Sequence, residues 1–304
     1  MSYLTFAFGL IILTFGANYF VKYAVGLAKH LGLHVAVFGA VIVAIGTSLP
    51  ELVITIESAL NNQSEIIIGN ILGSNIANIG LVLGISLLLG KISLNNVNLN
   101  NKNSLLIGLS FLFIGLLWFK MLFWPFGIFL LIIASFLIFD LYKSRNQQII
   151  PPTQKINNLI INSLLLILCL IGVIIGSQII ISSSLSIAET WGVTIGAVAA
   201  TIIAVGTSLP ELAVTLFAIR KKEHGLAIGN IIGSNLFNLV LIGGIGSIIT
   251  NLSVNISLSM TIFFILFTIA AYLLVKGVVK PKAYHGAILM CIYFLFVIFE
   301  YTNV

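Results

Sequence analysis

The hexapeptide Gly-Thr-Ser-Leu-Pro-Glu occurs twice in this chain, at 46–51 and again at 206–211, each time inside a long apolar run. Each copy therefore puts a proline and a carboxylate where the flanking residues predict a membrane interior. An ionisable side chain at that depth costs about 2.5–3.5 kcal/mol on insertion scales. Two identical copies of so unfavourable a segment indicate a shared function, and they are typical of an ion site near the bilayer midplane built by internal duplication.

Composition supports the membrane setting. The 304 residues are 60% hydrophobic and 7% charged, whereas a soluble domain has about 25% charged residues. The mean hydropathy is +1.19. We therefore expect a polytopic membrane protein in contact with the lipid bilayer. The net charge of +6 would suggest nucleic acid for a soluble protein, but here it reflects lysines in short loops, so nucleic-acid binding is not expected.

Ten apolar runs are predicted to be transmembrane helices, since about 20 apolar residues cross a bilayer. They are 3–28, 34–60, 65–90, 104–119, 124–143, 157–183, 192–220, 225–250, 255–275 and 283–301. The chain is thus predicted to be an all-α polytopic membrane protein. A polar linker at 144–156, predicted to be cytoplasmic, separates a first five-helix repeat at 1–143 from a second at 157–304.

From about residue 16 to 86 the first half aligns without gaps with the second at a constant offset of 160 residues, as between Glu51 and Glu211. The matches also include Gly16 with Gly176, Gly69-Asn70-Ile71 with Gly229-Asn230-Ile231, Gly73-Ser74-Asn75 with Gly233-Ser234-Asn235, Asn78 with Asn238, and Gly84 with Gly244. Because each half has an odd number of helices, the halves must cross the membrane in opposite directions. The sequence therefore predicts two inverted repeats, the plan of many secondary transporters.

The basic residues predict the orientation, because they are enriched in cytoplasmic loops. With the N-terminus outside, only Lys120 falls on the external side. The other thirteen fall on the cytoplasmic side: Lys22, Lys29, Lys91, Lys102, Lys143, Arg145, Lys155, Arg220, Lys221, Lys222, Lys276, Lys280 and Lys282.

The prolines predict free backbone carbonyls beside the two glutamates. Pro50 has no N–H and its ring crowds the preceding turn, which frees the carbonyls near Gly46 and Thr47. Pro210 has the same effect near Gly206 and Thr207. Irregular backbone at membrane depth is tolerated where it lines a cavity, and a cation is a suitable partner for it.

The helix after each hexapeptide supplies uncharged oxygen ligands. Asn70, Ser74 and Asn78 share one helix face, whereas Asn75 points to another. The second half repeats them as Asn230, Ser234, Asn235 and Asn238. A site with hard oxygen ligands alone selects Ca²⁺, Na⁺ or related ions over Zn²⁺ or copper. Two glutamates would neutralise one divalent ion, and with two freed carbonyls they approach the six to eight oxygens that Ca²⁺ takes.

Other polar and small residues have structural interpretations. The pairs Gly69/Gly73 and Gly229/Gly233 are typical of close helix packing. Glu57 lies six residues after Glu51 and its counterpart at offset 160 is a phenylalanine, so we interpret it as a polar residue at the outer helix end.

The hexapeptides together with the Gly-Ser-Asn-x-x-Asn helices resemble the alpha repeats of the sodium/calcium exchanger family of the calcium/cation antiporter superfamily, along essentially the whole chain. The resemblance implies a central Ca²⁺ site. It also implies flanking Na⁺ sites, an external N-terminus, and a first and a sixth helix that slide as a gate over a rigid core. The implied Ca²⁺ ligands are Glu51, Glu211 and the carbonyls of Thr47 and Thr207. The implied Na⁺ ligands add the carbonyls of Ala44 and Ala204 and the hydroxyls of Ser48, Ser74, Ser208 and Ser234. Asn78 and Asn238 complete the middle position.

The middle position departs from part of that family. Some relatives, including potassium-dependent exchangers, have Asp where this chain has Asn238, so this site offers two carboxylates instead of three. The difference argues against K⁺ co-transport and leaves the Na⁺ stoichiometry open.

The resulting prediction is a prokaryotic plasma-membrane antiporter, not an enzyme, that exchanges Na⁺ for Ca²⁺ by alternating access and needs no cofactor. Proton-coupled or other divalent-cation exchange on the same scaffold stays open, because buried glutamates can take up protons. A cation channel or a non-transporting membrane protein is disfavoured, since the duplicated site lies within one chain. The same argument is compatible with a monomer, although the sequence does not fix the oligomeric state.

Overall fold

The computed structural model describes residues 2–89, 99–144, 158–190 and 206–302, and every regular element in these ranges is helical. In the first half these are α1 (Ser2–His30), α2 (Val35–Phe38), η1 (Gly39–Val43), α3 (Ala44–Thr47), α4 (Leu49–Leu60), α5 (Ser64–Ala77), η2 (Asn78–Leu83), α6 (Gly84–Leu88), α7 (Asn100–Trp118) and α8 (Trp124–Ser144). In the second half they are α9 (Leu159–Thr190), α11 (Leu209–Arg220), α12 (His224–Phe237), η3 (Asn238–Ile242), α13 (Gly243–Ile249), α14 (Leu258–Val275) and α15 (Ala283–Thr302). The predicted all-α class is confirmed.

Seven of the described helices are long and apolar enough to cross a membrane, or eight if the bent pair at 35–60 counts as one span. A shorter apolar helix covers Trp124–Phe139. The predicted helix at 192–220 is described only from residue 206 onward, and nearly all of the linker at 144–156 lies outside the described residues. The count of ten spans and the domain boundaries therefore stay predictions.

Both hexapeptides break their helices at the same serine. In the first copy α3 ends at Thr47, Ser48 leaves helical geometry with φ −85° and ψ 11°, and α4 begins one residue later. The two segments meet at an angle of 46°. Ser208 has φ −86° and ψ 4° at the corresponding point before α11. Proline fits the first turn of the new helix because the N–H that it lacks has no partner there.

The local backbone repeats at the 160-residue offset in two further places. Asn62 and Lys222 have φ of 56° and 62° in the tight turns that follow α4 and α11. The next helix of each half then changes from an α-helix to a π-helical turn, which begins at Asn78 in η2 and at Asn238 in η3. Single π-helical turns are rare and frequently occur at functional sites.

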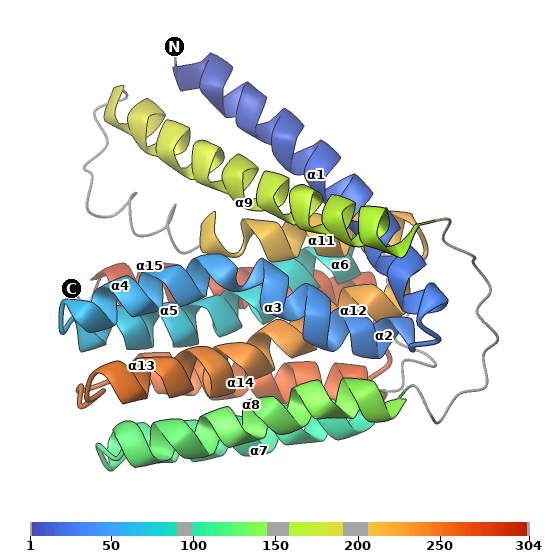
Figure 1. The fold of residues 1–304 in the computed structure, drawn as a ribbon. Coiled ribbons are helices and arrows are strands. Elements are labelled where there is room, and N and C mark those ends of the chain that lie inside the picture. Colours follow the sequence, from blue (N-terminus) through green and yellow to red (C-terminus); the bar gives the residue numbers. More distant parts are fainter. Residues whose placement is uncertain (1, 90–98, 145–157, 191–205, 303–304) are drawn as a thin grey trace.

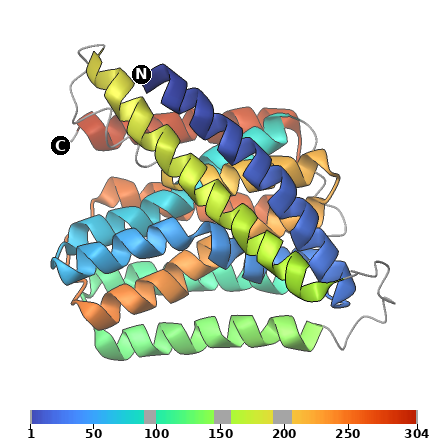
Figure 2. The ribbon, with the colours of Figure 1, turned by 45° about the horizontal axis from the view of Figure 1, so that its top comes forward.

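Helices α1 and α9 pack side by side and cross the other helices obliquely (Figures 1 and 2). Small residues allow the close contact: a Cβ added at Gly16 would lie 3.0 Å from the backbone nitrogen of Val173, and one added at Gly176 would lie 2.6 Å from that of Leu13. The two helices share a hydrophobic cluster with α11 and parts of the neighbouring elements, separate from the main core.

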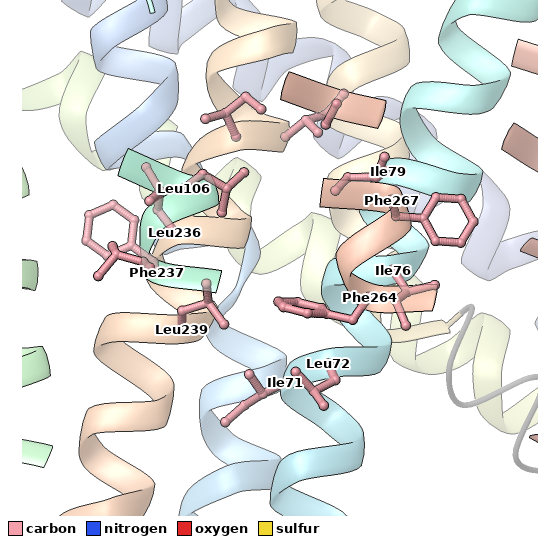
Figure 3. Close-up of a cluster of buried hydrophobic side chains, with 14 of the residues drawn as sticks. Ile71, Leu72, Ile76, Ile79, Leu106, Leu236, Phe237, Leu239, Phe264 and Phe267 are labelled. Atoms are coloured by element: carbon pink, nitrogen blue, oxygen red, sulfur yellow. The ribbon is translucent and has the colours of Figure 1, made fainter. Parts of the chain in front are cut away.

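The main core joins α5, α7, α12 and α14 with the π-helical turns (Figure 3). Phe264 and Phe267 of α14 lie against Ile76 and Ile79, while Phe237 and Leu239 lie in the same cluster from the second half. This core encloses the central segments that carry the buried polar residues. Large apolar side chains such as Phe136 are instead exposed on the outer surface, as expected for helices that face lipid.

Candidate functional site

The two hexapeptides meet in the interior through the second glutamate. The Ser48 hydroxyl, from the first hexapeptide, donates a hydrogen bond to Glu211 Oε1 over 3.1 Å. Ser234, on the following helix of the second half, donates to the same oxygen over 3.4 Å. Each of these side chains is at most 3% exposed. The predicted residues of the two halves therefore belong to one site.

Thr47 joins the halves at a second point. Its hydroxyl donates to Asn230 Oδ1 over 3.0 Å and lies 3.4 Å from the hydroxyl of Ser234. The same hydroxyl lies 3.3 Å from the carbonyl of Ala44. The Ala44 carbonyl also accepts the Ser48 N–H over 3.0 Å. The backbone around the helix break is thereby fixed against α12.

Glycines on α12 bring it close enough for these contacts. A Cβ added at Gly229 would lie 2.3 Å from the carbonyl oxygen of Ala36, and one added at Gly233 would lie 2.3 Å from that of Ala40. Since Asn230 and Ser234 each follow one of these glycines, the backbone contact delivers both side chains to Thr47. The packing predicted for this glycine pair is confirmed. No described residue approaches Gly69 or Gly73 within 4 Å in the same way, so their packing stays a prediction.

Two asparagines support the backbone of the glutamates, in a role that the sequence did not indicate. Asn70 Nδ2 donates to the carbonyl of Glu51 over 2.9 Å and to Thr55 Oγ1 over 3.1 Å. Asn230 Nδ2 makes the equivalent contacts with Glu211 and Thr215, at 3.4 and 3.2 Å. The sequence feature that could have indicated this role is a pair of threonines, one four residues after each glutamate, which match at the 160-residue offset.

Four asparagines form the centre of the molecule, and we call Asn75, Asn78, Asn235 and Asn238 the amide cluster. Asn75 and Asn235 each donate to the other's backbone carbonyl over 3.2 Å. Asn78 donates to Asn235 Oδ1 over 3.0 Å, and Asn238 donates to Asn75 Oδ1 over 3.1 Å. The sequence predicted that Asn75 points to a different face from Asn70, Ser74 and Asn78 and assigned it no function, whereas here Asn75 and Asn78 both contact Asn235.

Most of the buried oxygens without a hydrogen-bond partner belong to this site. Among the described residues there are eight such side-chain atoms, and Asn103 Oδ1 and Ser110 Oγ lie elsewhere. The other six are Glu51 Oε1 and Oε2, Glu211 Oε2, Asn78 Oδ1, Asn238 Oδ1 and Ser208 Oγ. Buried polar atoms are normally paired, so these six oxygens are the main candidates for cation ligands in the part of the chain that the structure describes.

The electrostatics favour a cation as well. Glu51 and Glu211 are at most 1% exposed, so two acidic groups lie in the apolar interior. The described residues contain no group of three or more His, Cys, Asp or Glu side chains that could hold a metal ion. The site therefore offers two carboxylates and neutral oxygens, which suit Ca²⁺ and Na⁺.

The remaining predicted ligands are buried, with one exception that lies outside the described residues. Ser74 is buried and donates to the carbonyl of Asn70 over 2.5 Å. Thr207 and Ser208 are buried in the second hexapeptide. Ala204 lies outside the described residues, so its predicted carbonyl contact stays untested.

Apolar helices around two buried carboxylates and an oxygen-lined centre define a membrane cation transporter. The comparison with known families is specific: the sodium/calcium exchanger protein family matches residues 1–142 and 161–302, and this chain belongs to that family. It is therefore a membrane protein of a transporter family.

Relatives and solved structures agree with the assignment. The chain is 30% identical to the sodium/calcium exchanger MaX1 of Methanosarcina acetivorans, with 98% of both chains covered. It is 34% identical to the putative antiporter CaxA of Alkalimonas amylolytica, over 79% of this chain and 78% of that protein. Its fold matches the sodium-calcium exchanger NCX_Mj soaked with Na⁺ in the absence of Ca²⁺, with a TM-score of 0.83, 27% identity and 97% of both chains covered.

Proposed function

We propose that this protein exchanges Na⁺ for Ca²⁺ across a prokaryotic plasma membrane by alternating access. The observation that carries the proposal is a set of six buried oxygens without a partner, three of them on Glu51 and Glu211 and the others on Asn78, Asn238 and Ser208. Ser48 of the first hexapeptide donates to Glu211 of the second, which joins the two halves at this point. Membership in the sodium/calcium exchanger family supports the same ions.

The ligand assignment follows the buried oxygens and the family resemblance. We propose that Glu51, Glu211 and the carbonyls of Thr47 and Thr207 bind Ca²⁺. Na⁺ would use the same glutamates together with the carbonyls of Ala44 and Ala204 and the hydroxyls of Ser48, Ser74, Ser208 and Ser234. Asn78 and Asn238 would supply the middle oxygens. Two carboxylates neutralise one Ca²⁺ or two Na⁺, so both ions compete for one charge pair.

This competition accounts for exchange without leak. Without a cation, Glu51 and Glu211 hold two like charges in a medium of low dielectric, where their repulsion is strong. Moving this unneutralised pair between the two access states is unfavourable, so the carrier should switch sides only when it is loaded. Ca²⁺ can then leave on one side only if Na⁺ replaces it.

The proposed architecture has ten transmembrane helices in two inverted five-helix repeats, with the N-terminus outside. It is supported by the 160-residue sequence offset and by the matching helix breaks, turns and π-helical turns. We further propose that α1 and α9 slide over the other helices to open the site to one side at a time. The close backbone contacts between them at Gly16 and Gly176 support movement as a pair.

Tracer uptake into proteoliposomes tests the function. Vesicles that contain the purified protein are preloaded with Na⁺, with choline, or with choline and a pH gradient, and ⁴⁵Ca²⁺ entry is measured. We expect uptake only with internal Na⁺. Uptake driven by the pH gradient alone would instead assign the protein to proton-coupled exchange, and single-channel currents would assign it to a channel.

Glutamine variants test the site within the same assay. Glu51→Gln and Glu211→Gln remove one negative charge each while they preserve side-chain size, so each is expected to reduce Na⁺-driven uptake to background at unchanged expression. Glu57→Gln is the matched control, because Glu57 lies on the same helix as Glu51 but is exposed. Wild-type uptake in either site variant would contradict the ligand assignment.

Membrane potential tests the stoichiometry. If three Na⁺ exchange for one Ca²⁺, one net charge crosses per cycle, and this contributes about 2.3 kcal/mol per 100 mV. A K⁺ gradient with valinomycin sets the potential. Because three Na⁺ leave for each Ca²⁺ that enters, one positive charge moves outward, so we expect Ca²⁺ entry to slow when the vesicle interior is made negative and to accelerate when it is made positive. A rate of Ca²⁺ entry that does not change with the membrane potential would exclude this stoichiometry.

A further inference from the structure

The hydrogen bonds of the amide cluster determine, for each of its side chains, which way Nδ2 points and which way Oδ1 points. Asn75, Asn78, Asn235 and Asn238 are at most 1% exposed. Each asparagine side chain has one donor end and one acceptor end. Which end points where decides whether a cation nearby meets an oxygen or an NH₂ group.

The orientations can be assigned starting from two backbone carbonyls, because a carbonyl can only accept a hydrogen bond. Asn75 and Asn235 each lie 3.2 Å from the other's carbonyl oxygen, so each must direct Nδ2 toward it. Their Oδ1 atoms are then the remaining ends, and these can only accept as well. Asn238 must consequently direct Nδ2 toward Asn75 Oδ1. By the same reasoning, Asn78 must direct Nδ2 toward Asn235 Oδ1.

The consequence concerns the opposite ends of the two outer amides. With the nitrogen atoms of Asn78 and Asn238 directed at these acceptors, their Oδ1 atoms form the opposite ends of the side chains, and both oxygens are buried without a protein partner. A reversed amide would present hydrogens to a cation and would also set Oδ1 of Asn78 or Asn238 against another acceptor. The cluster therefore excludes the orientation that repels a cation.

We propose that Asn75 and Asn235 are positioning residues, which hold Asn238 and Asn78 with their oxygens presented to the transported cation. This inference rests on the proposed function. Each positioning residue acts on the other half of the protein: Asn75 orients Asn238, and Asn235 orients Asn78. The cation-binding amides are thus correctly oriented only when α5 and α12 pack together.

A double-mutant cycle tests this crossed arrangement. The variants are Asn75→Leu, Asn238→Ala and Asn78→Ala, alone and combined, in purified full-length protein. The readout is the Ca²⁺ concentration that gives half of the maximal rise in thermal midpoint, which measures binding without transport. The midpoint without Ca²⁺ reports any purely structural effect.

We expect Asn75→Leu to raise the half-maximal Ca²⁺ concentration by about ten-fold or more, as is typical when a group that orients a metal ligand is removed. In the Asn238→Ala background most of this effect should disappear, because the oriented side chain is absent. In the Asn78→Ala background most of it should persist. Equal effects in both backgrounds, or a change only in the midpoint without Ca²⁺, would overturn the proposal.

A measurement on the wild-type protein covers the case in which Asn75→Leu does not fold. Infrared difference spectra are recorded on addition of Na⁺ or Ca²⁺, with ¹³C-labelled asparagine side chains to identify their carbonyl bands. We expect a cation-dependent shift that is reduced in Asn78→Ala and in Asn238→Ala. The absence of any cation-sensitive asparagine band would refute the proposal. If Na⁺-driven uptake fails while the shift is present, the proposed exchange is wrong, whereas the presentation of the Asn78 and Asn238 oxygens to the cation stands.

Discussion

At the scale of single residues, the buried site depends on side chains that make hydrogen bonds to two different segments. Asn230 is fully buried, and its Oδ1 accepts from Thr47 while its Nδ2 donates to the carbonyl of Glu211 and to Thr215. One amide thus fixes the first hexapeptide and the second glutamate at once. A buried polar group left without a partner costs about 1–3 kcal/mol, so such a residue contributes to stability as well as to site geometry.

Asn230→Ala is expected to lower stability strongly. It leaves two hydroxyls and one carbonyl without this partner, so the thermal midpoint of the purified protein in detergent should fall by several degrees and Ca²⁺ affinity should fall with it. Asn61→Ala is the control. Asn61 makes a single exposed hydrogen bond to the carbonyl of Glu57, and its loss should change stability by about 0.5 kcal/mol or less. Equal midpoints for the two variants would contradict this account.

At the scale of helices, the site is held by one close contact and two breaks. Gly229 and Gly233 let α12 approach the backbone of α2 and η1, while the breaks at Ser48 and Ser208 redirect the chain beside each glutamate. The repeated hexapeptide predicted both breaks, because the effects of proline are local. It also predicted a shared site, because identical segments at membrane depth imply a common environment.

Gly233→Ala tests the close contact. Its added Cβ would lie 2.3 Å from the carbonyl oxygen of Ala40, so α12 must move away and the contact between Thr47 and Asn230 should lengthen. Overpacking of this kind costs about 1–3 kcal/mol, and we expect both the thermal midpoint and Na⁺-driven ⁴⁵Ca²⁺ uptake to decrease. In Gly108→Ala, where no described atom lies within 4 Å of the added Cβ, the midpoint should be unchanged or slightly raised, since alanine favours helix. If Gly233→Ala changed neither the thermal midpoint nor the uptake, the contact between Gly233 and the backbone of Ala40 would be looser than described.

The parts of the site that the sequence did not predict depend on partners distant along the chain. Asn75 lies off the Ser74 face, and its partners are 160 and 163 residues away. No local periodicity specifies such a pairing. The π-helical turns at Asn78 and Asn238 were likewise missed, because the same apolar residues fit an ordinary α-helix and the extra residue per turn is visible only in three dimensions.

At the scale of the whole molecule, one helix covers both hexapeptides. A Cβ added at Gly46 would lie 2.9 Å from a methyl carbon of Leu170, and one added at Gly206 would lie 2.3 Å from a side-chain carbon of Ile181, both on α9. Movement of α9 along the core would therefore change what covers each hexapeptide. This geometry gives the proposed sliding gate a direct test.

A disulfide between Ile181→Cys and Gly206→Cys should fix α9 to the second hexapeptide. The two Cβ positions are 3.6 Å apart, within the range of about 3.5–4.5 Å that disulfides require. In protein whose native cysteines at 169 and 291 are replaced by serine, oxidation should stop Na⁺-driven ⁴⁵Ca²⁺ uptake and reduction should restore it. Ile181→Cys alone in the same background is the control, and it should retain exchange after oxidation because it has no second cysteine with which to form the link. If exchange continues when α9 is fixed to the core, α9 is not the moving element, and access must alternate by another motion.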